Sequence, residues 1–518
     1  MTRSFAWSRF VRRYLEWLLI LGALNPLATA AETNSAMPLE ERAPHGSGSD
    51  PILVRDIFGR AVNDHRIVLV DWPGYMANPY VKLRMDPPAG FAFPIIASLA
   101  ANSPRLMFDT PSTLSSRGPS KVVKFDSPES HPEFLMEICP KHDPGDEEYE
   151  LTIKFRDAKG RQSGTRIPIH VISQKEIQPP RSKLVFDYRY DTINHNFDDP
   201  ACRRAAESAM NDWFSYFEES EFDTVPAGSE IMGLVIDDWK GHDPATNNAP
   251  YRGFWVFCRG IHGPYSTGYP NNGVFGSPKF HQLNGNPTPF YRSFAYIFHF
   301  HSNATVFASV KDDQWYLADP YKVTDVYGLT MHEFGHAIAY NSTWAGMARY
   351  KNNGGEDPDV VQYMGQPVPL DNSYHIPGDF KYFDRLSGQN GAYGSRFPPK
   401  RWMLTKLALL IAKNAGWHLR ALSPFIPAQI TSPASLPPAL RSTSYHYQLE
   451  AAGGVPSYDW LVMEGQLPPG LSLNRFTGEI GGAPTSTAQP GVYDVKIQLR
   501  DCDEQAKPAT KAVRIILQ

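Results

Sequence analysis

The sequence predicts a multidomain protein in which a mixed α/β domain lies between two β-rich domains. The chain has 518 residues, which exceeds what one hydrophobic core usually supports. Apolar and polar residues alternate in short runs near both ends, whereas helical periodicity occurs between them. We therefore expect four consecutive parts, namely a β-domain over residues 51–175, an α/β domain over 176–422, a Pro-rich linker over 423–438 and a β-domain over 439–518.

The first β-domain is expected to be a β-sandwich. Residues 81–85 alternate apolar with basic side chains, and residues 149–156 repeat the alternation before a Gly-containing turn at 157–160. Strands of period two joined by such turns are typical of sandwiches. The segment shows no catalytic constellation, so we interpret it as a packing or spacer module.

Three helices are predicted in the middle domain. The first covers residues 200–217, and the Asp-Asp-Pro at its N-terminus is a favourable helix start. The second carries the histidine motif described below. The third covers residues 403–414 and ends at Ala-Gly-Trp, where Gly416 suits a C-cap.

The last β-domain contains a distinctive segment. Residues 467–484 read L-P-P-G-L-S-L-N-R-F-T-G-E-I-G-G-A-P and resemble the repeat of bacterial immunoglobulin-like, cadherin-like surface modules. The resemblance implies an extracellular immunoglobulin-like β-sandwich that binds a cell-surface or matrix ligand or acts as a spacer. Some members of that group bind Ca²⁺. Asp501 and Asp503 are the Ca²⁺ candidates here, and solvated loop carboxylates are the favoured interpretation.

The N-terminus has the pattern of a secretory signal peptide over residues 1–30. Basic residues precede an apolar stretch, and Ala28-Thr29-Ala30 forms a small-x-small cleavage site. We expect cleavage near Ala30, a secreted, extracellular protein without a stable membrane anchor, and a disordered polar leader over residues 31–50. A retained membrane anchor is the alternative.

Composition and cysteine content limit the other classes of function. A net charge of −4 and a pI of about 6.5 argue against a protein built mainly to hold nucleic acid. Four cysteines lie beyond the predicted cleavage site, namely Cys139, Cys202, Cys258 and Cys502. In an exported chain they permit two disulfides, with Cys202–Cys258 as the favoured pair, or four buried thiols.

The motif H-E-F-G-H at residues 332–336 predicts a zinc site. Histidines four residues apart lie on one face of a helix, so His332 and His336 can reach one ion. Glu333 then serves as general base toward a zinc-activated water, which is the chemistry of metallopeptidases. A helix with two ordinary surface or core histidines is the alternative interpretation.

The residues around the motif agree with a helix that is apolar on one face. Asp325 is a suitable N-cap. At about 100° per residue, the side chains opposite the two histidines are those of Tyr327, Met331, Phe334 and Ile338.

Four segments resemble bacterial metallopeptidases related to leishmanolysin, in the metzincin group. Residues 325–340, D-V-Y-G-L-T-M-H-E-F-G-H-A-I-A-Y, resemble the active helix of that family. Residues 365–375, G-Q-P-V-P-L-D-N-S-Y-H, are similar to the segment with the distant third histidine. Residues 401–417 resemble the closing helix, and residues 186–192 resemble the first strand, so the likeness covers roughly 230 residues.

The resemblance implies a zincin catalytic domain with one catalytic Zn²⁺. The metal ligands would be His332, His336 and His375, and Glu333 would be the general base. The chain would then be a secreted zinc metalloendopeptidase that hydrolyses peptide bonds in a protein or peptide substrate.

Two departures from the family pattern matter. Ala339 and Ser342 replace the Gly and His of the short continuation H-E-x-x-H-x-x-G-x-x-H, which excludes the compact metzincin layout but not the long-insert one. Leu386, in D-R-L-S-G, stands where the family has the Met of its Met-turn, although leucine can also fill an apolar floor below a metal site.

The replacement of the family's Met by Leu386 favours an alternative function, a non-catalytic surface or matrix adhesion protein that retains the peptidase fold. The intact Glu333 opposes that alternative. A carbohydrate- or cell-wall-binding adhesin is a third hypothesis.

The third zinc ligand has a rival. Glu356 lies 20 residues after His336, the spacing of thermolysin-like enzymes, but its context N-N-G-G-E-D-P-D disfavours the helix that those enzymes use. His375 follows an extended, Pro-containing stretch, and the family resemblance points to it, so we predict His375. His299 and His301 are further candidate zinc ligands, interpreted as ordinary hydrogen-bonded strand histidines. Asp379, four residues beyond His375, is a candidate to orient a ligand and is interpreted as a solvated loop carboxylate.

Overall fold

The structure is a computed structural model of the 518-residue chain. It describes residues 52–72, 76–109, 118–141, 145–173, 184–189, 191, 195–218, 224–232, 245–251, 253–258, 267–270, 282–283, 286–287, 294–298, 305–307, 323–342, 344–389, 391, 402–422 and 424–518. These residues belong to one compact unit, Ser49–Gln518. The predicted signal peptide, the leader, and the candidates His299 and His301 lie outside the described residues.

The first domain consists of two sheets that share a hydrophobic core. The first sheet has four antiparallel strands, in the order β1 (Leu53–Arg55), β3 (Val81–Asp86), β7 (Glu133–Ile138) and β5 (Leu106–Asp109). The second has five, in the order β2 (Ile67–Asp71), β9 (Gln162–Ser173), β8 (Glu147–Arg156), β4 (Ile95–Ala101) and β6 (Ser120–Phe125). In that sheet β2 pairs with β9 in parallel, and the remaining pairs are antiparallel.

Alternation along the strands produces this core. In β4 and β3 every second side chain is buried while its neighbours face solvent or lie at the rim. Because strand side chains point to opposite faces in turn, each sheet has one apolar face. Buried residues of both sheets form a single cluster, so the predicted two-layer β-domain is present.

The middle domain is built around a mixed sheet and two long helices. The order of its strands is β10 (Leu184–Asp187), β13 (Phe254–Cys258), β17 (Phe294–Phe298) and β14 (Thr267–Pro270), with β14 antiparallel to β17 and the other pairs parallel. Three two-stranded pairs accompany it: β11 (Glu230–Met232) with β12 (Ala245–Thr246), β15 (Gln282–Leu283) with β16 (Asn286–Pro287), and β18 (Thr305–Phe307) with β19 (Val323–Asp325).

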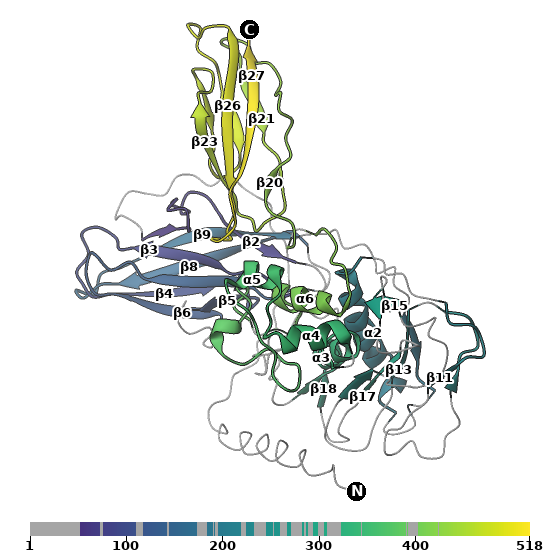
Figure 1. Ribbon diagram of the computed structural model, residues 1–518. Coiled ribbons are helices and arrows are strands. Elements are labelled where there is room, and N and C mark those ends of the chain that lie inside the picture. The colour runs from purple at the N-terminus through teal and green to yellow at the C-terminus, as the bar shows by residue number, and fades with distance from the viewer. Residues whose placement is uncertain are drawn as a thin grey trace. The chain divides into compact units, whose positions relative to one another are not determined.

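Of the five described α-helices in this domain, three correspond to the predicted helices, whereas those at Ala345–Asn352 and Pro358–Met364 were not predicted. The five helices are α2 (Pro200–Ser215), α3 (Val326–Ile338), α4 (Ala345–Asn352), α5 (Pro358–Met364) and α6 (Lys406–Ala412), with short 3₁₀ turns at Asn196–Asp198, Phe380–Tyr382 and Lys413–Ala415 (Figure 1). Asp199 caps α2, and Gly416 ends the last helical turn in a left-handed conformation. The third helix begins later than predicted, because the Thr405 hydroxyl accepts the N–H of Ala408 and makes Thr405 the N-cap.

The first and middle domains share a second hydrophobic core. Val70, Trp72, Met76 and Ala77 of the first domain are buried in the same cluster as residues of α2, α3 and α6. The predicted boundary near residue 175 therefore separates two sequence segments but not two independent cores. The interpretation of the first domain as a spacer is incomplete for this reason.

The C-terminal domain is a pair of three-stranded antiparallel sheets with its own core. One sheet contains β21 (Tyr445–Gln448), β25 (Glu479–Gly482) and β24 (Leu471–Leu473), and the other contains β23 (Asp459–Gly465), β26 (Gly491–Arg500) and β27 (Ala509–Leu517) (Figure 1). A further pair joins β20 (Gln429–Ile430) to β22 (Ala451–Ala452).

The predicted Pro-rich linker over residues 423–438 needs correction. Leu436 and Ala439 are buried in the C-terminal core, and Ser435 and Ala439 form bridges with Arg514 and Leu517 of β27. Proline is tolerated in such edge segments because one side of the backbone needs no ladder hydrogen bond. Most of the segment is therefore an edge of the C-terminal domain.

The favoured disulfide is absent as well. All four cysteines are thiols; Cys139, Cys202 and Cys258 are buried, and Cys502 is half-buried. The Cys202 thiol faces Asp199 at 3.9 Å, whereas Cys258 hydrogen-bonds with Tyr188, so the two sulfurs have different partners. Burial raises the pKa of Cys202 to about 11, which keeps that thiol protonated and unreactive.

One ion pair joins the middle and C-terminal domains. Arg385 binds Asp503 through both guanidinium nitrogens, with Nη2–Oδ2 at 2.6 Å, and both side chains are largely shielded from solvent. We expect Asp503→Asn to lower the free energy of unfolding by about 2 kcal/mol, because the shielded Arg385 guanidinium loses the carboxylate to which it hydrogen-bonds. Urea denaturation measures this change.

The matched control for that variant is Asp494→Asn. Asp494 and Arg514 form a similar two-point pair on the open face of β26 and β27, where solvent screens the charges. Equal effects of the two substitutions would contradict a specific role for the pair between the domains.

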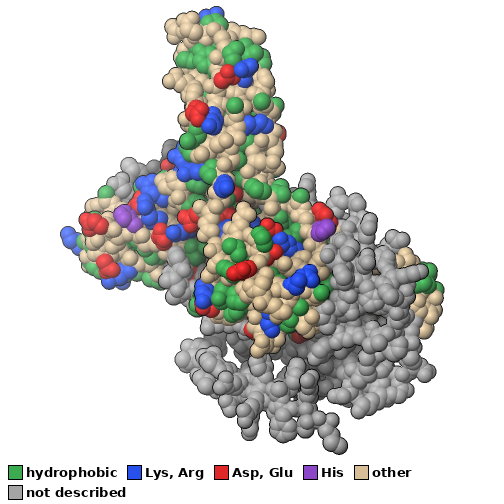
Figure 2. Space-filling view, viewed as in Figure 1, with side chains coloured by type: hydrophobic (Ala, Val, Ile, Leu, Met, Phe, Trp, Pro, Cys, Tyr) green, Lys and Arg blue, Asp and Glu red, His purple; other side chains and the backbone are tan. Residues whose placement is uncertain are grey.

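The surface carries charges of both signs. Figure 2 shows acidic and basic side chains interspersed on the viewed face, in keeping with the nearly balanced composition. Within the part of the chain that the structure describes, every helix is too short or too polar to cross a membrane.

Candidate metal centre

Helix α3 presents the two motif histidines from one face. Asp325 caps the helix by accepting the N–H of Gly328, as the sequence predicts. His332 and His336 follow four residues apart, and their ring centroids are 4.8 Å apart. Both side chains are therefore directed to the same place by the helical repeat.

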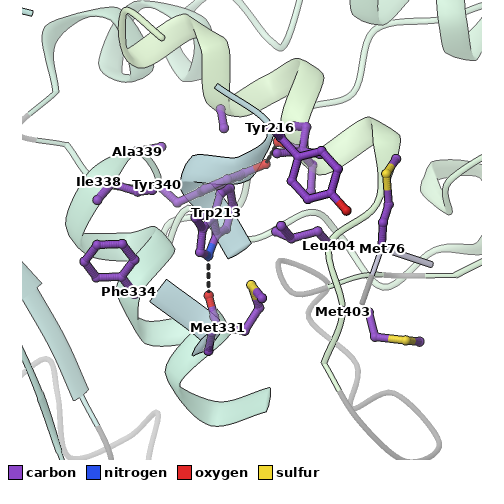
Figure 3. Packing of buried hydrophobic residues seen from close by; sticks show 14 of the residues in the cluster. Met76, Trp213, Tyr216, Met331, Phe334, Ile338, Ala339, Tyr340, Met403 and Leu404 are labelled. Carbon is purple, nitrogen blue, oxygen red and sulfur yellow. Dashed lines mark hydrogen bonds between the residues drawn. The ribbon is translucent and has the colours of Figure 1, made fainter. Parts of the chain in front are cut away.

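The opposite face of α3 anchors the helix in the core. Tyr327, Met331, Phe334 and Ile338 are each 0% exposed, as the helical pattern predicts. Figure 3 shows Met331 and Phe334 among these packed side chains, with the indole N–H of Trp213 donating to the Met331 carbonyl at 2.8 Å. Because the apolar face is held in place, the histidine face has a defined orientation.

His375 reaches the same place from a loop. Asp371 organises this loop: its carboxylate accepts the N–H of Ser373 and of His375, and its own N–H donates to the His375 carbonyl at 2.9 Å. Tyr374 takes a left-handed φ of 65° in this tight turn. The turn delivers one imidazole from a segment that is neither helix nor strand.

Three ring nitrogens converge. The Nε2 atom of His375 lies 3.2 Å from Nε2 of His336 and 3.3 Å from Nε2 of His332. Ligands about 2.1 Å from one tetrahedral zinc are about 3.4 Å apart, so the spacing fits a single ion. Among the described residues, this is the cluster of His, Cys, Asp or Glu side chains whose ligand atoms are close enough to share a metal.

The protonation state of His336 suits a metal ligand. Its Nδ1 lies 2.8 Å from the Tyr340 carbonyl, and since a carbonyl only accepts, Nδ1 carries the proton and Nε2 the lone pair. Burial, aided by the neighbouring His375, lowers the pKa of His336 to about 3. Burial also lowers the pKa of His375, while Asp371 opposes that shift. The neutral imidazole is the form that binds a metal.

Trp402 forms a wall of the site and was missed by the sequence reasoning. Its ring stacks on His332 with centroids 4.5 Å apart and planes 20° apart. His332 is also nearly parallel to His375, at 5.1 Å and 14°. Trp402 is 70 positions from His332 in the chain, and no local pattern relates the two.

The other predicted side chains are placed as follows. Glu333 is half-buried on α3, between the two motif histidines in sequence. Glu356 is exposed in the loop between α4 and α5 and is not part of the histidine cluster. Asp379 is an exposed loop residue that accepts the N–H of Lys381 at the start of a 3₁₀ turn. Only the histidines predicted as ligands are therefore brought together here.

Leu386 occupies a well-organised buried turn. It is 6% exposed and belongs to the same core as Met331 and Phe334 of α3. The Asp384 carboxylate holds the turn by accepting the N–H groups of Leu386, Ser387 and Leu407. Sequence reasoning singled out Leu386 but not Asp384, whose role becomes visible only from these long-range bonds.

The two Ca²⁺ candidates have protein partners. Asp501 accepts the backbone N–H groups of Val455 and Asp503, and Asp503 is paired with Arg385. Both carboxylates are thus shielded structural acceptors between loops, and not the solvated loop carboxylates that the sequence favoured.

Comparison with known proteins identifies the C-terminal domain. Residues 427–515 match the family model described as "Putative Ig domain", which confirms the predicted immunoglobulin-like domain. No curated protein matches the chain. The protein is therefore a multidomain, mostly β-sheet protein with an immunoglobulin-like C-terminal domain.

Solved structures show only distant similarity. A protocadherin GammaB4 extracellular domain has 10% identity and a TM-score of 0.18, and the match covers 90% of this chain and 51% of that one. A conjugative transposon lipoprotein from Bacteroides eggerthii has 9% identity and a TM-score of 0.15, covering 23% of this chain and 96% of that one. The PapD-like domain 7 of human CEP192 has 11% identity and a TM-score of 0.17, covering 27% and 99% respectively.

Proposed function

We propose that this chain is a zinc-dependent metallopeptidase whose active site is formed by α3 and the loop of His375. The observation that carries the proposal is the convergence of three histidine Nε2 atoms at 3.2 and 3.3 Å, beside a glutamate on the same helix. Three neutral imidazoles form the ligand set of many catalytic zinc sites, which keep one further position open. A zinc site with a purely structural role has no need of Glu333.

The chemistry is divided between metal and protein. Bound zinc would lower the pKa of a water molecule toward neutrality and polarise the scissile carbonyl. Glu333 accepts the proton of the attacking water and passes it to the leaving amine, which requires it to act first as base and then as acid. The Tyr340 carbonyl keeps the proton of His336 on Nδ1, so that Nε2 faces the cluster.

The assignment to a particular type of metallopeptidase is supported by sequence resemblance. Residues 325–340, 365–375 and 401–417 resemble leishmanolysin-like metallopeptidases, so we propose a zincin domain and an endopeptidase acting on protein or peptide substrates. The N-terminal signal pattern supports secretion. The immunoglobulin-like domain suits an extracellular protein that also contacts a cell-surface or matrix ligand.

The direct test is metal analysis combined with a general protease assay. We expect the purified protein to contain about one zinc per chain and to degrade unfolded protein. A chelator should remove both the metal and the activity, and added zinc should restore them. A folded, carefully prepared sample without zinc would overturn the proposal.

A second candidate function is a non-catalytic adhesion protein that keeps the metal site. Two observations favour it, namely the immunoglobulin-like domain and the replacement of the family's methionine by Leu386. The same assay separates the two functions, because the second predicts about one zinc per chain without hydrolysis of any protein substrate.

A further inference from the structure

A short segment of the first domain enters the core of the middle domain. Residues 76–80 precede β3, and Met76 and Ala77 are 0% and 1% exposed in the core that also contains Met331 and Phe334 of α3. Met76 forms a parallel bridge with Leu404, and Figure 3 shows the two side by side. This segment connects the first domain to the surroundings of the metal centre.

Two backbone hydrogen bonds fix the connection. The N–H of Ala77 donates to the Leu404 carbonyl at 2.7 Å, and the N–H of Tyr80 donates to the Leu386 carbonyl at 2.9 Å. The first acceptor lies two residues after Trp402, and the second lies in the turn held by Asp384. The same five-residue segment therefore holds both the strand-like stretch that carries Trp402 and the turn that carries Leu386.

The segment is itself rigidly attached to the first domain. Asn78 is 1% exposed, and its side chain accepts the N–H of Trp72 at 2.7 Å. Its amide donates to Asp71 Oδ1 at 2.9 Å and to the Ile138 carbonyl at 3.0 Å. These three bonds reach β2, the residue after it, and β7, so the segment cannot shift without disturbing both sheets.

We infer that Trp402 is a positioning residue of the metal centre and that residues 76–80 of the first domain hold it against His332. The stacked indole limits rotation of the His332 ring, so that Nε2 stays directed toward His336 and His375. Groups that orient a metal ligand contribute to metal affinity although they do not touch the metal. The first domain is in this way part of the site, which gives it a function beyond that of a spacer. The inference rests on the proposed function in that the three histidines hold the metal.

The first experiment compares two substitutions of Trp402 in the full protein. Trp402→Phe keeps an aromatic plane against His332, whereas Trp402→Leu keeps an apolar side chain and removes the plane. We expect Trp402→Leu to weaken zinc binding by about 10- to 100-fold, measured by competition with a chelator. Trp402→Phe should bind zinc about as tightly as the unsubstituted protein. The d–d absorption spectrum of the Co²⁺-loaded protein should change with Trp402→Leu, because the ligand geometry relaxes.

The second experiment tests the supporting segment. Ala77→Pro removes the N–H that donates to Leu404 and should weaken zinc binding as Trp402→Leu does. The matched control is Ala158→Pro, which removes a single backbone bond to Ala92 in the β8–β9 turn of the same domain. It should leave zinc affinity unchanged. If Ala77 acts through Trp402, the double variant should bind zinc little worse than either single variant.

The outcomes separate the inference from the proposed function. If the unsubstituted protein binds no zinc, the proposed function fails. If it binds zinc and Trp402→Leu binds equally well with the same Co²⁺ spectrum, the inference fails alone. If Trp402→Leu or Ala77→Pro is destabilised, its zinc affinity is compared with that of Leu99→Ala. That substitution lowers stability away from the metal centre, because Leu99 is buried in the core between the two sheets of the first domain. A partly destabilised Trp402→Phe that still binds zinc normally supports the inference. Additive losses in the double variant overturn the role of the segment.

Discussion

Replacing Glu333 by glutamine is expected to lower kcat by about 100-fold or more while the protein keeps its zinc. The residue lies on α3 between the motif histidines but is not one of the three side chains whose ligand atoms converge. Glutamine has nearly the same shape and no basic oxygen, so proton transfer is lost and metal binding is not. Steady-state kinetics and metal analysis on the same sample measure the two properties.

Glu356→Gln is the matched control for Glu333→Gln. It makes the same chemical change on an exposed loop outside the histidine cluster, and we expect neither kcat nor zinc content to change. A Glu333→Gln protein that loses its zinc, or that retains activity within about tenfold, would contradict the role of Glu333 as general base.

Replacing His375 by alanine is expected to reduce zinc affinity by more than the about 10- to 100-fold that changes outside the ligand set usually cause. His375 supplies one of three converging nitrogens, and two histidines alone leave zinc without the three protein ligands typical of catalytic sites. Chelator competition measures the affinity, and hydrolysis should be lost with the metal.

Asp371→Asn tests how the loop delivers His375. The amide oxygen can still accept the N–H of His375, so zinc binding should weaken less than in His375→Ala. If Glu356→Ala removes the metal and His375→Ala does not, the site is thermolysin-like and the proposed ligand set is wrong.

Several features were predictable because they depend on neighbouring residues. The cap at Asp325, the histidines at i and i+4, and the apolar face of α3 follow from helical periodicity, which sequence displays directly. Alternation in β3 and β4 likewise predicts which side chains enter the core of the first domain. The immunoglobulin-like domain was predicted from a local segment at residues 467–484, and the family match over residues 427–515 confirms it.

The errors arose where a local pattern has two physical meanings. A Pro-rich stretch can be a linker or an edge segment, and residues 429–439 are the latter because they bond to β22 and β27. Cysteines in an exported chain can pair or remain buried. Here Cys202 and Cys258 have separate partners, and burial keeps them as thiols.

What the sequence determined by itself is the set of short-range decisions: helix caps, strand alternation, and two histidines with a glutamate on one helix face. Each of these depends on residues within a few positions of one another, where backbone geometry dictates which side chains meet. His375 was predicted from the family resemblance and not from local geometry, and the tertiary structure shows its ring nitrogen beside those of His332 and His336. Only the tertiary structure decided that Trp402 stacks on His332 and that residues 76–80 bond to the carbonyls of Leu386 and Leu404. Such contacts join residues tens or hundreds of positions apart. They form because distant apolar segments are buried in one core, and no local preference of the chain specifies which segments those will be.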